Sequence, residues 1–297
     1  MSFKSGFIAI IGRPNVGKSS ILNQIFESKI AIVSDKVQTT RNPIRGILNE
    51  EDSQLVFIDT PGIHEPKDEL GKELNRESFA QLEGIDLIFF VIDGSERFGP
   101  QDQRILDRIK GGETPIILVV NKIDKLSKSK LLAKLSELNE LHNFAAIIPV
   151  SAVEKDNLDT LLNVAKTYLP DDVAYFSTEG KSSVDYERSF LFSELIREKV
   201  LHFTHDEIPH DVAIVIENLE ESEDEIFIQA LLLVQKASQK PIVLGKQGQM
   251  IKKIRLAAQR SIRASQNKKC TLELFVRVEK DWRTKKSKIE DLGYGNQ

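Results

Sequence analysis

A loop rich in glycine near the start of the chain has the composition of a phosphate-binding site. It reads Gly12-Arg13-Pro14-Asn15-Val16-Gly17-Lys18-Ser19 and is followed by Ser20. In such a loop the glycines let main-chain N–H groups close around phosphate oxygens, while the lysine adds a positive charge and the serine offers a hydroxyl to Mg²⁺. Apolar residues at 7–11 and 20–26 predict a strand before the loop and a helix after it. This context predicts a nucleoside triphosphate site.

A carboxylate follows the apolar run Leu55–Ile58, in the stretch Asp59-Thr60-Pro61-Gly62. A buried strand there would deliver Asp59 to its carboxyl end, where the side chain can hold Mg²⁺ through water. Gly62 would let its main-chain N–H approach a γ-phosphate. Alone, these four residues are typical of a turn. Their position one strand interval after the phosphate loop favours the metal site.

The stretch Asn121-Lys122-Ile123-Asp124 has the residue types that distinguish guanine from adenine. Asp124 can accept two N–H groups from the guanine edge, and Asn121 can reach the N7 and O6 side of the ring. A site built on such bonds rejects adenine by ~10⁴ or more, because its buried polar groups would otherwise be left unpaired. Ser151-Ala152, after another apolar run, would give a main-chain N–H to the guanine oxygen. Helix capping by Asp124 is the alternative, but the order of the four motifs predicts a GTPase.

These motifs resemble those of the Era-type GTPases, a family within the translation-factor-related GTPases. The resemblance includes Gln38-Thr39-Thr40-Arg41 and continues through the second domain. It implies that Thr40 ligates Mg²⁺ together with Ser19 and Asp59 when a γ-phosphate is bound, with Thr39 as the alternative. Lys18, Thr40 and Gly62 are predicted to act in hydrolysis. The predicted nucleotide site comprises Gly12, Arg13, Pro14, Asn15, Val16, Gly17, Lys18, Ser19, Ser20, Asp59, Thr60, Pro61, Gly62, Ile63, Asn121, Lys122, Ile123, Asp124, Ser151 and Ala152.

Two residues bear on the rate of hydrolysis. Ile63 stands where Ras-type enzymes have a glutamine that orients water, and an apolar side chain cannot do so. We therefore expect slow intrinsic turnover. Asn15, together with Thr39-Thr40, resembles the arrangement in GTPases that use K⁺ in place of an arginine finger, whose contribution reaches ~10⁵ in rate. The hypothesis is that K⁺ stimulates this enzyme.

The elements that must position these residues alternate along the first half of the chain. Apolar runs predict strands, and amphipathic stretches between them predict helices, as in a doubly wound, mostly parallel α/β sheet. Ligands of such sheets bind beyond the carboxyl ends of the strands. The predicted strands are 7–12, 42–49, 54–59, 87–93, 115–121 and 145–151, and the predicted helices are 17–27, 69–82, 101–110, 129–141 and 158–168.

Length and composition indicate a two-domain protein of a reducing compartment. The chain has 297 residues, of which 40% are hydrophobic and 29% charged, as in ordinary soluble proteins. A single cysteine, Cys270, excludes an internal disulfide framework. The first residues lack the pattern of a signal peptide, and the longest apolar runs are too short to cross a bilayer. We expect a cytoplasmic protein with a GTPase domain at 1–170, a linker at 171–187 and a second domain at 188–297.

The second domain is predicted to be α+β, with a helix at 189–203, strands at 212–220 and 225–233, a short extended run at 241–244, a helix near 249–264 and a strand at 271–278. Although the formal net charge is −4, positive charge concentrates between Lys236 and Lys288, where Glu273, Glu279 and Asp281 are the acidic residues. A basic segment on an acidic chain predicts a local site for a polyanion.

Gly245-Lys246-Gln247-Gly248 lies in this basic segment. The KH module uses a G-x-x-G loop to clamp the backbone of a few unpaired nucleotides. A lone G-x-x-G is weak, but the domain resembles the helix–strand–strand–helix–helix–strand order of a type II KH domain. Lys252, Lys253 and Arg255 are predicted to face the phosphates. Trp282 is open to two interpretations, stacking on a base or packing in the core.

The resemblance also implies a cellular role. Era-type proteins act in assembly of the small (30S) ribosomal subunit and bind single-stranded 16S rRNA near its 3′ end. We therefore expect a monomer that binds GTP or GDP with Mg²⁺, and K⁺ by hypothesis, and that binds RNA but not DNA. Two alternatives stay open: a regulatory GTPase associated peripherally with the inner face of the cell membrane, or a KH scaffold that binds proteins.

Overall fold

A computed structural model describes residues 2–33, 44–61, 68–80, 82, 84–180, 182–185 and 187–292. The chain divides into two compact units. The first contains most of the chain up to Asp185, and the second contains most of the chain beyond it.

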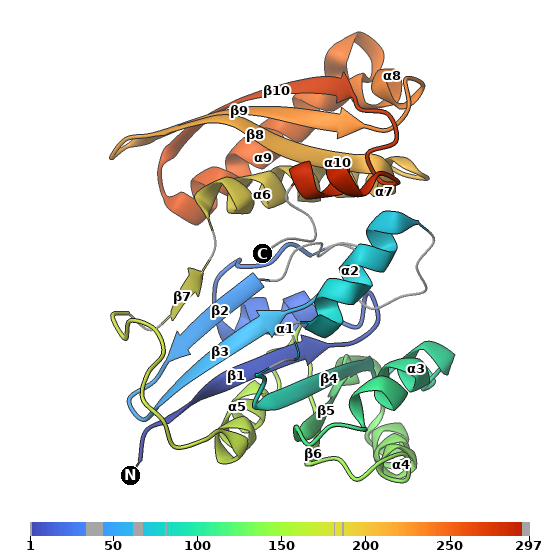
Figure 1. Ribbon diagram of the computed structural model, residues 1–297, viewed down its shortest axis with the longest axis vertical. Helices are drawn as coiled ribbons and strands as arrows, with labels where there is room; N and C mark the ends of the chain where they lie inside the picture. Colours follow the sequence, from blue (N-terminus) through green and yellow to red (C-terminus); the bar gives the residue numbers. More distant parts are fainter. Residues whose placement is uncertain are drawn as a thin grey trace. The chain divides into compact units, whose positions relative to one another are not determined.

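In the described part of the first unit, seven strands form one sheet in the order β6-β5-β4-β1-β3-β2-β7 (Figure 1). β2 runs antiparallel to β3, and β7 antiparallel to β2, whereas the remaining neighbours are parallel. The predicted doubly wound, mostly parallel sheet is confirmed. The strands are β1 (Lys4–Ile11), β2 (Ile44–Asn49), β3 (Ser53–Asp59), β4 (Leu87–Asp93), β5 (Ile116–Asn121), β6 (Ala146–Pro149) and β7 (Ser182–Asp185).

Helices cover both faces of this sheet, which explains why its central strands are apolar throughout. Successive side chains of a strand point to opposite faces. Thus Ile8 and Ile10 of β1 share a core with α1 and α5, while Ala9 and Ile11 share another with α3 and α4. The helices that precede Asp185 in the chain are α1 (Lys18–Ile25), α2 (Glu69–Ala80), α3 (Pro100–Ile109), the 3₁₀ turn η1 (Ile123–Lys125), α4 (Lys128–Asn139) and α5 (Leu158–Tyr168).

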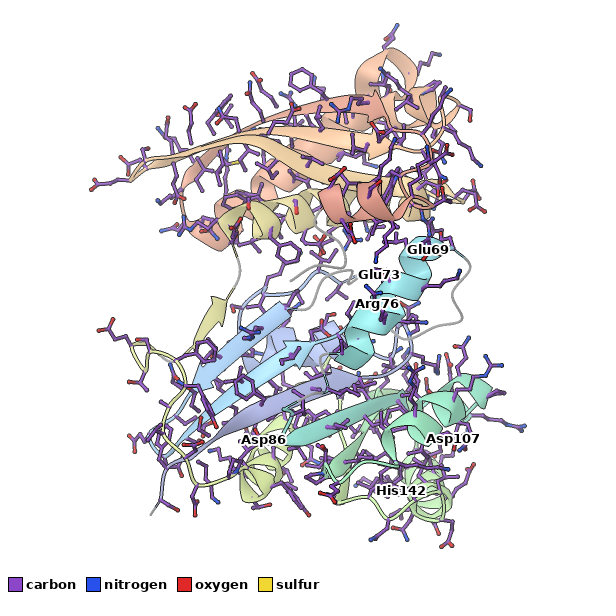
Figure 2. The ribbon with its side chains drawn as sticks, in the orientation of Figure 1. Glu69, Glu73, Arg76, Asp86, Asp107 and His142 are labelled. Atoms are coloured by element: carbon purple, nitrogen blue, oxygen red, sulfur yellow. The ribbon has the colours of Figure 1, made fainter. Side chains whose placement is uncertain are left out.

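Figure 2 labels three side chains near the ends of these elements, Asp86, Asp107 and His142. Asp86, just before β4, accepts a hydrogen bond of 2.7 Å from the main-chain N–H of Phe7 and so joins the start of β4 to β1. Asp107 of α3 pairs with Lys110 at 2.6 Å, and His142 lies edge-on to Phe144 with ring centroids 5.1 Å apart. The exposed Asp107 pair contributes little to stability.

The segment predicted as a linker is held to the first unit by two buried amides. Gln54, in β3, accepts from the main-chain N–H groups of Tyr175 and Phe176, and its own amide N–H donates to Phe176. Asn49 donates to the carbonyls of Ser177 and Gly180. Beyond Gly180, β7 extends the sheet along β2. This strand was not predicted from the sequence, because its pairing with β2 defines it and no apolar alternation marks it.

The second unit is an α+β domain, as predicted. In its described part, three strands lie in the order β10-β9-β8, with β9 parallel to β10 and antiparallel to β8 (Figure 1). Apolar side chains of α6 and α9 pack on this sheet. The elements are α6 (Arg188–Phe203), α7 (Ile208–Asp211), β8 (Val212–Glu221), β9 (Glu225–Val234), α8 (Gln239–Leu244), the 3₁₀ turn η2 (Lys246–Gly248), α9 (Gln249–Gln266), β10 (Lys269–Val278) and α10 (Lys286–Asp291).

The prediction of an extended run at 241–244 is wrong, because these residues belong to the helix α8. Pro241 is the third residue of that helix, where a missing N–H costs nothing since the first turn has no partner for it. Gln239 fixes the start of the helix: its amide donates to Asp211 at 2.6 Å and accepts from the N–H of Lys236 at 2.8 Å. The helix ends at Gly245, whose N–H donates to Pro241.

Trp282 packs in the interior of the second unit. Its side chain has no exposed surface, and its indole N–H donates to the carbonyl of Asp211 at 3.1 Å. The packing interpretation is therefore confirmed over base stacking, which needs an accessible ring face. Cys270 is also buried, and burial raises the pKa of its thiol to about 11. Within the described ranges, no helix is both long and apolar enough to span a bilayer.

Candidate nucleotide site and glycine loop

Steric crowding explains the glycines of the phosphate loop, which connects β1 to α1. A side chain at Gly12 would place its Cβ 2.3 Å from the carbonyl oxygen of Val91. At Gly17 the Cβ would lie 2.2 Å from Nδ2 of Asn121, and the main chain there has a φ of 98°. Asn15 also adopts a positive φ, of 66°. Only glycine fits at the first two positions, so the loop stays close to the strand ends behind it.

Lys18 is enclosed by its own loop. Its ammonium group donates to the carbonyls of Gly12 at 2.9 Å and Arg13 at 3.2 Å. Burial lowers the pKa of Lys18 to about 8, against the opposing effect of the nearby Asp59 carboxylate. A charge held in a low-dielectric site interacts strongly with an incoming anion. The lysine is thus placed to attract phosphate.

Ser19 and Asp59 come together as predicted for a Mg²⁺ site. The Ser19 hydroxyl donates to a carboxylate oxygen of Asp59 at 2.9 Å. Asp59 lies at the end of β3 and has no exposed surface. A hydroxyl and a carboxylate are hard oxygen ligands of the kind Mg²⁺ takes, so the donor set fits this ion. The third predicted ligand, Thr40, lies outside the described residues, as do Thr39, Gly62 and Ile63.

Two other predicted residues have structural roles beside this site. The hydroxyl of Thr60 donates to the carbonyl of Ile10 at 2.8 Å, which ties the end of β3 to β1. The carbonyl of Pro61 accepts from Ser78 of α2 at 3.1 Å. Both bonds hold the chain in place just after Asp59.

Asn121 joins three of the predicted motifs. Its amide N–H donates to the carbonyl of Val16 in the phosphate loop at 2.8 Å, and its side-chain oxygen accepts from the N–H of Ala152 at 3.1 Å. Ser151 donates to a carboxylate oxygen of Asp124 at 2.6 Å. Segments up to 136 positions apart in sequence thus meet at one edge of the sheet, where purine recognition was predicted.

Lys122 supports the phosphate loop from the neighbouring strand end. It has a φ of 65°, and its ammonium group donates to the carbonyl of Asn15 and to Asp93, both at 2.6 Å. Asp93 is buried at the end of β4. Burial acts to raise the pKa of Asp93, but hydrogen bonds from Lys122 and Ser95 outweigh it and lower the pKa. Asp93 was not among the predicted site residues, although a carboxylate at the end of an apolar strand is a signal that the sequence contains.

Arg13 is anchored outside the loop. Its guanidinium bonds to Asp102 of α3 at 3.1 Å and also pairs with Glu96. Asp102 is buried and accepts from the N–H of Gly99, so the same carboxylate caps α3 and holds Arg13. Nothing in the local sequence marks these two acidic partners.

The glycine loop of the second unit connects α8 to α9, and its first glycine is required for the same steric reason. At Gly245 a Cβ would lie 2.6 Å from the Cβ of Met250, and φ is 72°. Gly248 also has a positive φ, of 74°, but a Cβ there would meet nothing within 4 Å. Gln247 between them has a φ of 51°. Lys246 is exposed at the tip of the loop. The conformation presents main chain and one positive charge to solvent.

The predicted basic residues of α9 differ in their surroundings. Lys252 and Lys253 are exposed and Arg255 is half-buried. The Lys253 ammonium lies 4.2 Å from the ring centroid of Phe203 in α6, which is cation–π geometry. Lys252 is turned about 100° away on the helix. The two lysines therefore point in different directions from α9.

Comparison with known proteins agrees with this geometry. The family described as 50S ribosome-binding GTPase matches residues 7–122, and the KH domain family matches residues 207–283. A crystal structure of a Tyr→Ala variant of Aquifex aeolicus Era bound to GDP and AlF₄⁻ is 34% identical, covers 99% of this chain and 100% of its own, and superposes with a TM-score of 0.95. A structure of Era with MgGDPNP and nucleotides 1506–1542 of 16S ribosomal RNA has the same identity and coverage and a TM-score of 0.94. The chain belongs to the Era family of GTPases.

Proposed function

We propose that this chain is a Mg²⁺-dependent GTPase that binds 16S ribosomal RNA through its second unit and acts in assembly of the small ribosomal subunit. One observation carries the proposal. A relative that is 34% identical over the full length has been crystallised with both MgGDPNP and an rRNA fragment. The two loops that such ligands require are both formed here, one in each unit.

Each side chain of the first unit has a distinct part in this activity. Lys18 holds the phosphates, and Ser19 and Asp59 hold Mg²⁺, together with Thr40 as predicted from the family. Mg²⁺ held by these side chains would supply positive charge that offsets the negative charge developing on the transferred phosphoryl group. Asn121 and Asp124 read the guanine. Phosphoryl transfer depends on positioning and on electrostatic stabilisation, which the enclosed lysine and the neighbouring oxygen ligands are suited to supply.

The test of the proposal measures both ligands on the full chain. We expect Mg²⁺-dependent hydrolysis of GTP but not ATP, and binding of an RNA with the sequence of 16S nucleotides 1506–1542. Gly248→Asp should weaken RNA binding, because it places a negative charge on the clamp without a steric clash. Gly180→Asp, at another glycine with positive φ and open surroundings, is the matched control. Equal RNA affinity of the two variants would contradict the role of the loop.

Stimulation by K⁺ is part of the proposal. Asn15 lies in the phosphate loop and has a positive φ of 66°. A monovalent cation beside its side chain would offset charge that develops in the transition state. At equal ionic strength, the rate of GTP hydrolysis should be at least about ten-fold higher in KCl than in NaCl. Equal rates would remove this part of the proposal and leave the rest intact.

In the cell, we infer a cytoplasmic monomer whose RNA affinity differs between the GTP and GDP states, since a switch requires such a difference. Membrane association and a protein-binding KH scaffold are the alternatives. Flotation with anionic liposomes, measured with and without ribonuclease, tests membrane association. Flotation that is lost at high salt but unchanged by ribonuclease would support it. Crosslinking to cellular RNA with GTP or GDP bound tests the protein-binding alternative, because a scaffold that binds only proteins would capture no RNA.

A further inference from the structure

The phosphate loop is held at its start by a helix that lies outside the predicted nucleotide motifs. Arg13, the second residue of the loop, donates through its Nε–H to Oδ1 of Asp102, in the first turn of α3, at 3.1 Å. The side chain of Asp102 is 3% exposed and that of Arg13 is 17% exposed. A hydrogen bond between two charged groups is strong and directional, and burial protects it from screening by salt. The main chain at Arg13 is therefore tied to the position of α3.

Asp102 uses its two carboxylate oxygens for different partners. Oδ1 accepts from Arg13, whereas Oδ2 accepts from the main-chain N–H of Gly99 at 3.1 Å and so closes the start of α3. Leu106 of α3 packs in the same core as Ile11, the last residue of β1 before the loop, and both are completely buried. Because a close-packed core resists displacement, the carboxylate is a rigid support for the loop.

The supported residue also holds the buried lysine of the loop. The carbonyl of Arg13 accepts from the Lys18 ammonium at 3.2 Å, beside the carbonyl of Gly12 at 2.9 Å. A displacement of Arg13 would move one of these two acceptors. The guanidinium of Arg13 pairs with Glu96 at 2.5 Å as well as with Asp102, so its charge is offset on the protein side. Arg13 therefore contributes position more than charge to the phosphate site.

The support from α3 is separate from the guanine motif. Lys122 and Asn121, which belong to that motif, hold the carbonyls of Asn15 and Val16 in the same loop. Substitution of either would alter base recognition as well as the loop. Asp102 belongs to none of the predicted motifs, so its effect on the loop can be measured by itself.

We propose that Asp102 is a positioning residue: through Arg13 it holds the phosphate loop in its binding conformation and so sets how long GDP and GTP stay bound. The inference rests on the proposed GTPase activity. A loop that is already ordered loses less conformational entropy when the ligand binds. Affinity differences between variants of one site arise mainly from the dissociation rate. Asp102 thus acts on the release of nucleotide rather than on its capture.

The test measures both rates on the full chain with N-methylanthraniloyl-GDP. Asp102→Asn should raise the dissociation rate at least about ten-fold, the lower end of what a hydrogen bond to a charged group contributes, and leave the association rate nearly unchanged. The amide oxygen of asparagine can still accept from Gly99, as amides do at this helix position. Its NH₂ group then faces the Nε–H of Arg13, so the pair is lost while the helix start is kept.

Two matched variants serve as controls. Asp159→Asn, at an exposed carboxylate in the first turn of α5, should release the nucleotide at the parent rate. Glu96→Gln removes the other partner of Arg13, whose side chain is 57% exposed. It should change the dissociation rate less than about five-fold, because exposed ion pairs contribute little.

A double-mutant cycle separates positioning from a general structural effect. Arg13→Met removes the guanidinium and should by itself speed release about as much as Asp102→Asn. In the Arg13→Met background, Asp102→Asn should have little further effect, because the pair is already broken. An equal acceleration in both backgrounds would contradict the role of the pair and leave Asp102 with the start of α3 alone. Denaturant unfolding of each variant verifies that it is folded under the assay conditions.

Failure of this inference is distinguishable from failure of the proposed function. If the parent chain binds no guanine nucleotide, the proposed function fails. If it binds GDP, and both Asp102→Asn and Arg13→Met release it at the parent rate, the positioning role is wrong and the GTPase proposal stands.

Discussion

The side-chain amide of Asn121, at the end of β5, donates a 2.8 Å hydrogen bond to the main-chain carbonyl of Val16 in the phosphate loop. The same amide accepts from Ala152, so the guanine motif and the phosphate loop are held together by one side chain. Both Asn121 and Val16 are buried. The geometry of the loop thus depends on a residue 105 positions away.

Replacing Asn121 by alanine should therefore affect more than base recognition. The carbonyl of Val16 would lose its partner in a buried position, which costs about 1–3 kcal/mol of unfolding free energy. We expect guanine nucleotide affinity to fall more than ten-fold and the chain to unfold at lower denaturant concentration. Asn143→Ala, an exposed asparagine of the same unit, is the control for both measurements. Weakened GTP binding with unchanged stability would show that the bond to Val16 is dispensable.

Asp124→Asn should change which purine is bound. The carboxylate of Asp124 accepts hydrogen bonds, as it does from Ser151, whereas an amide would present N–H donors to the N–H groups of guanine. A hydrogen bond to a charged group contributes about 1.5–3 kcal/mol, so GTP affinity should fall about 10- to 150-fold. Xanthosine triphosphate, which carries an oxygen where guanine has its amino group, should bind the variant better than the parent.

Competition titrations with the two nucleotides measure this ratio. Asp159→Asn, at an exposed position in the first turn of α5, should keep the parent preference for GTP. An unchanged ratio in Asp124→Asn would mean that another group reads the base edge.

Nucleotide binding should depend on pH through Lys18. In the free protein burial lowers the pKa of Lys18 to about 8, while bound phosphates would raise it by favouring the charged form. Binding therefore favours the protonated lysine, and affinity should fall as pH rises above about 8. Between pH 8 and 9.5, calorimetry in buffers of different ionisation enthalpy should detect proton uptake on GDP binding.

Lys18→Arg provides the comparison, because a guanidinium stays charged over this range. Its affinity, whatever its value at pH 7, should be nearly constant between pH 7 and 9. A parent affinity that is equally flat would contradict the titration of Lys18.

Trp282→Phe should lower stability without changing RNA binding. The variant loses the indole hydrogen bond to Asp211 and leaves space in the core, which together cost about 2–3 kcal/mol. Calorimetric unfolding and RNA affinity, the latter measured well below the transition, separate the two effects. Phe275→Leu, at a ring that is 52% exposed, should alter stability by less than about 0.5 kcal/mol. Weaker RNA binding in a fully stable Trp282→Phe protein would restore the stacking interpretation.

Strands and helices with a strong local pattern were predictable from the sequence. The bounds of β4 and α5 agree with prediction, since a continuous apolar run and a regular amphipathic stretch mark them. The run at 241–244 was assigned wrongly, because a helix of six residues is too short for its period to be detected in the sequence. β7 was missed because it exists only through its partner β2.

The candidate sites likewise contain residues that the sequence predicts and contacts that it does not. The phosphate loop and the residues after β3, β5 and β6 were predictable, because parallel strands bring their carboxyl ends to one edge. The bonds from Asn121 to Val16 and from Arg13 to Asp102 were not, since each depends on side-chain directions of residues about 90 or more positions apart.

The chain has one indole, that of Trp282, and it is buried in the second unit. Ultraviolet emission excited at 295 nm (roughly the wavelength selective for this chromophore) consequently originates from that half of the molecule alone. A shift in the wavelength or intensity of this emission when GTP is added would mean that nucleotide binding at the phosphate loop changes the surroundings of Trp282 in the second unit. The native protein thus carries its own optical probe, with no label needed.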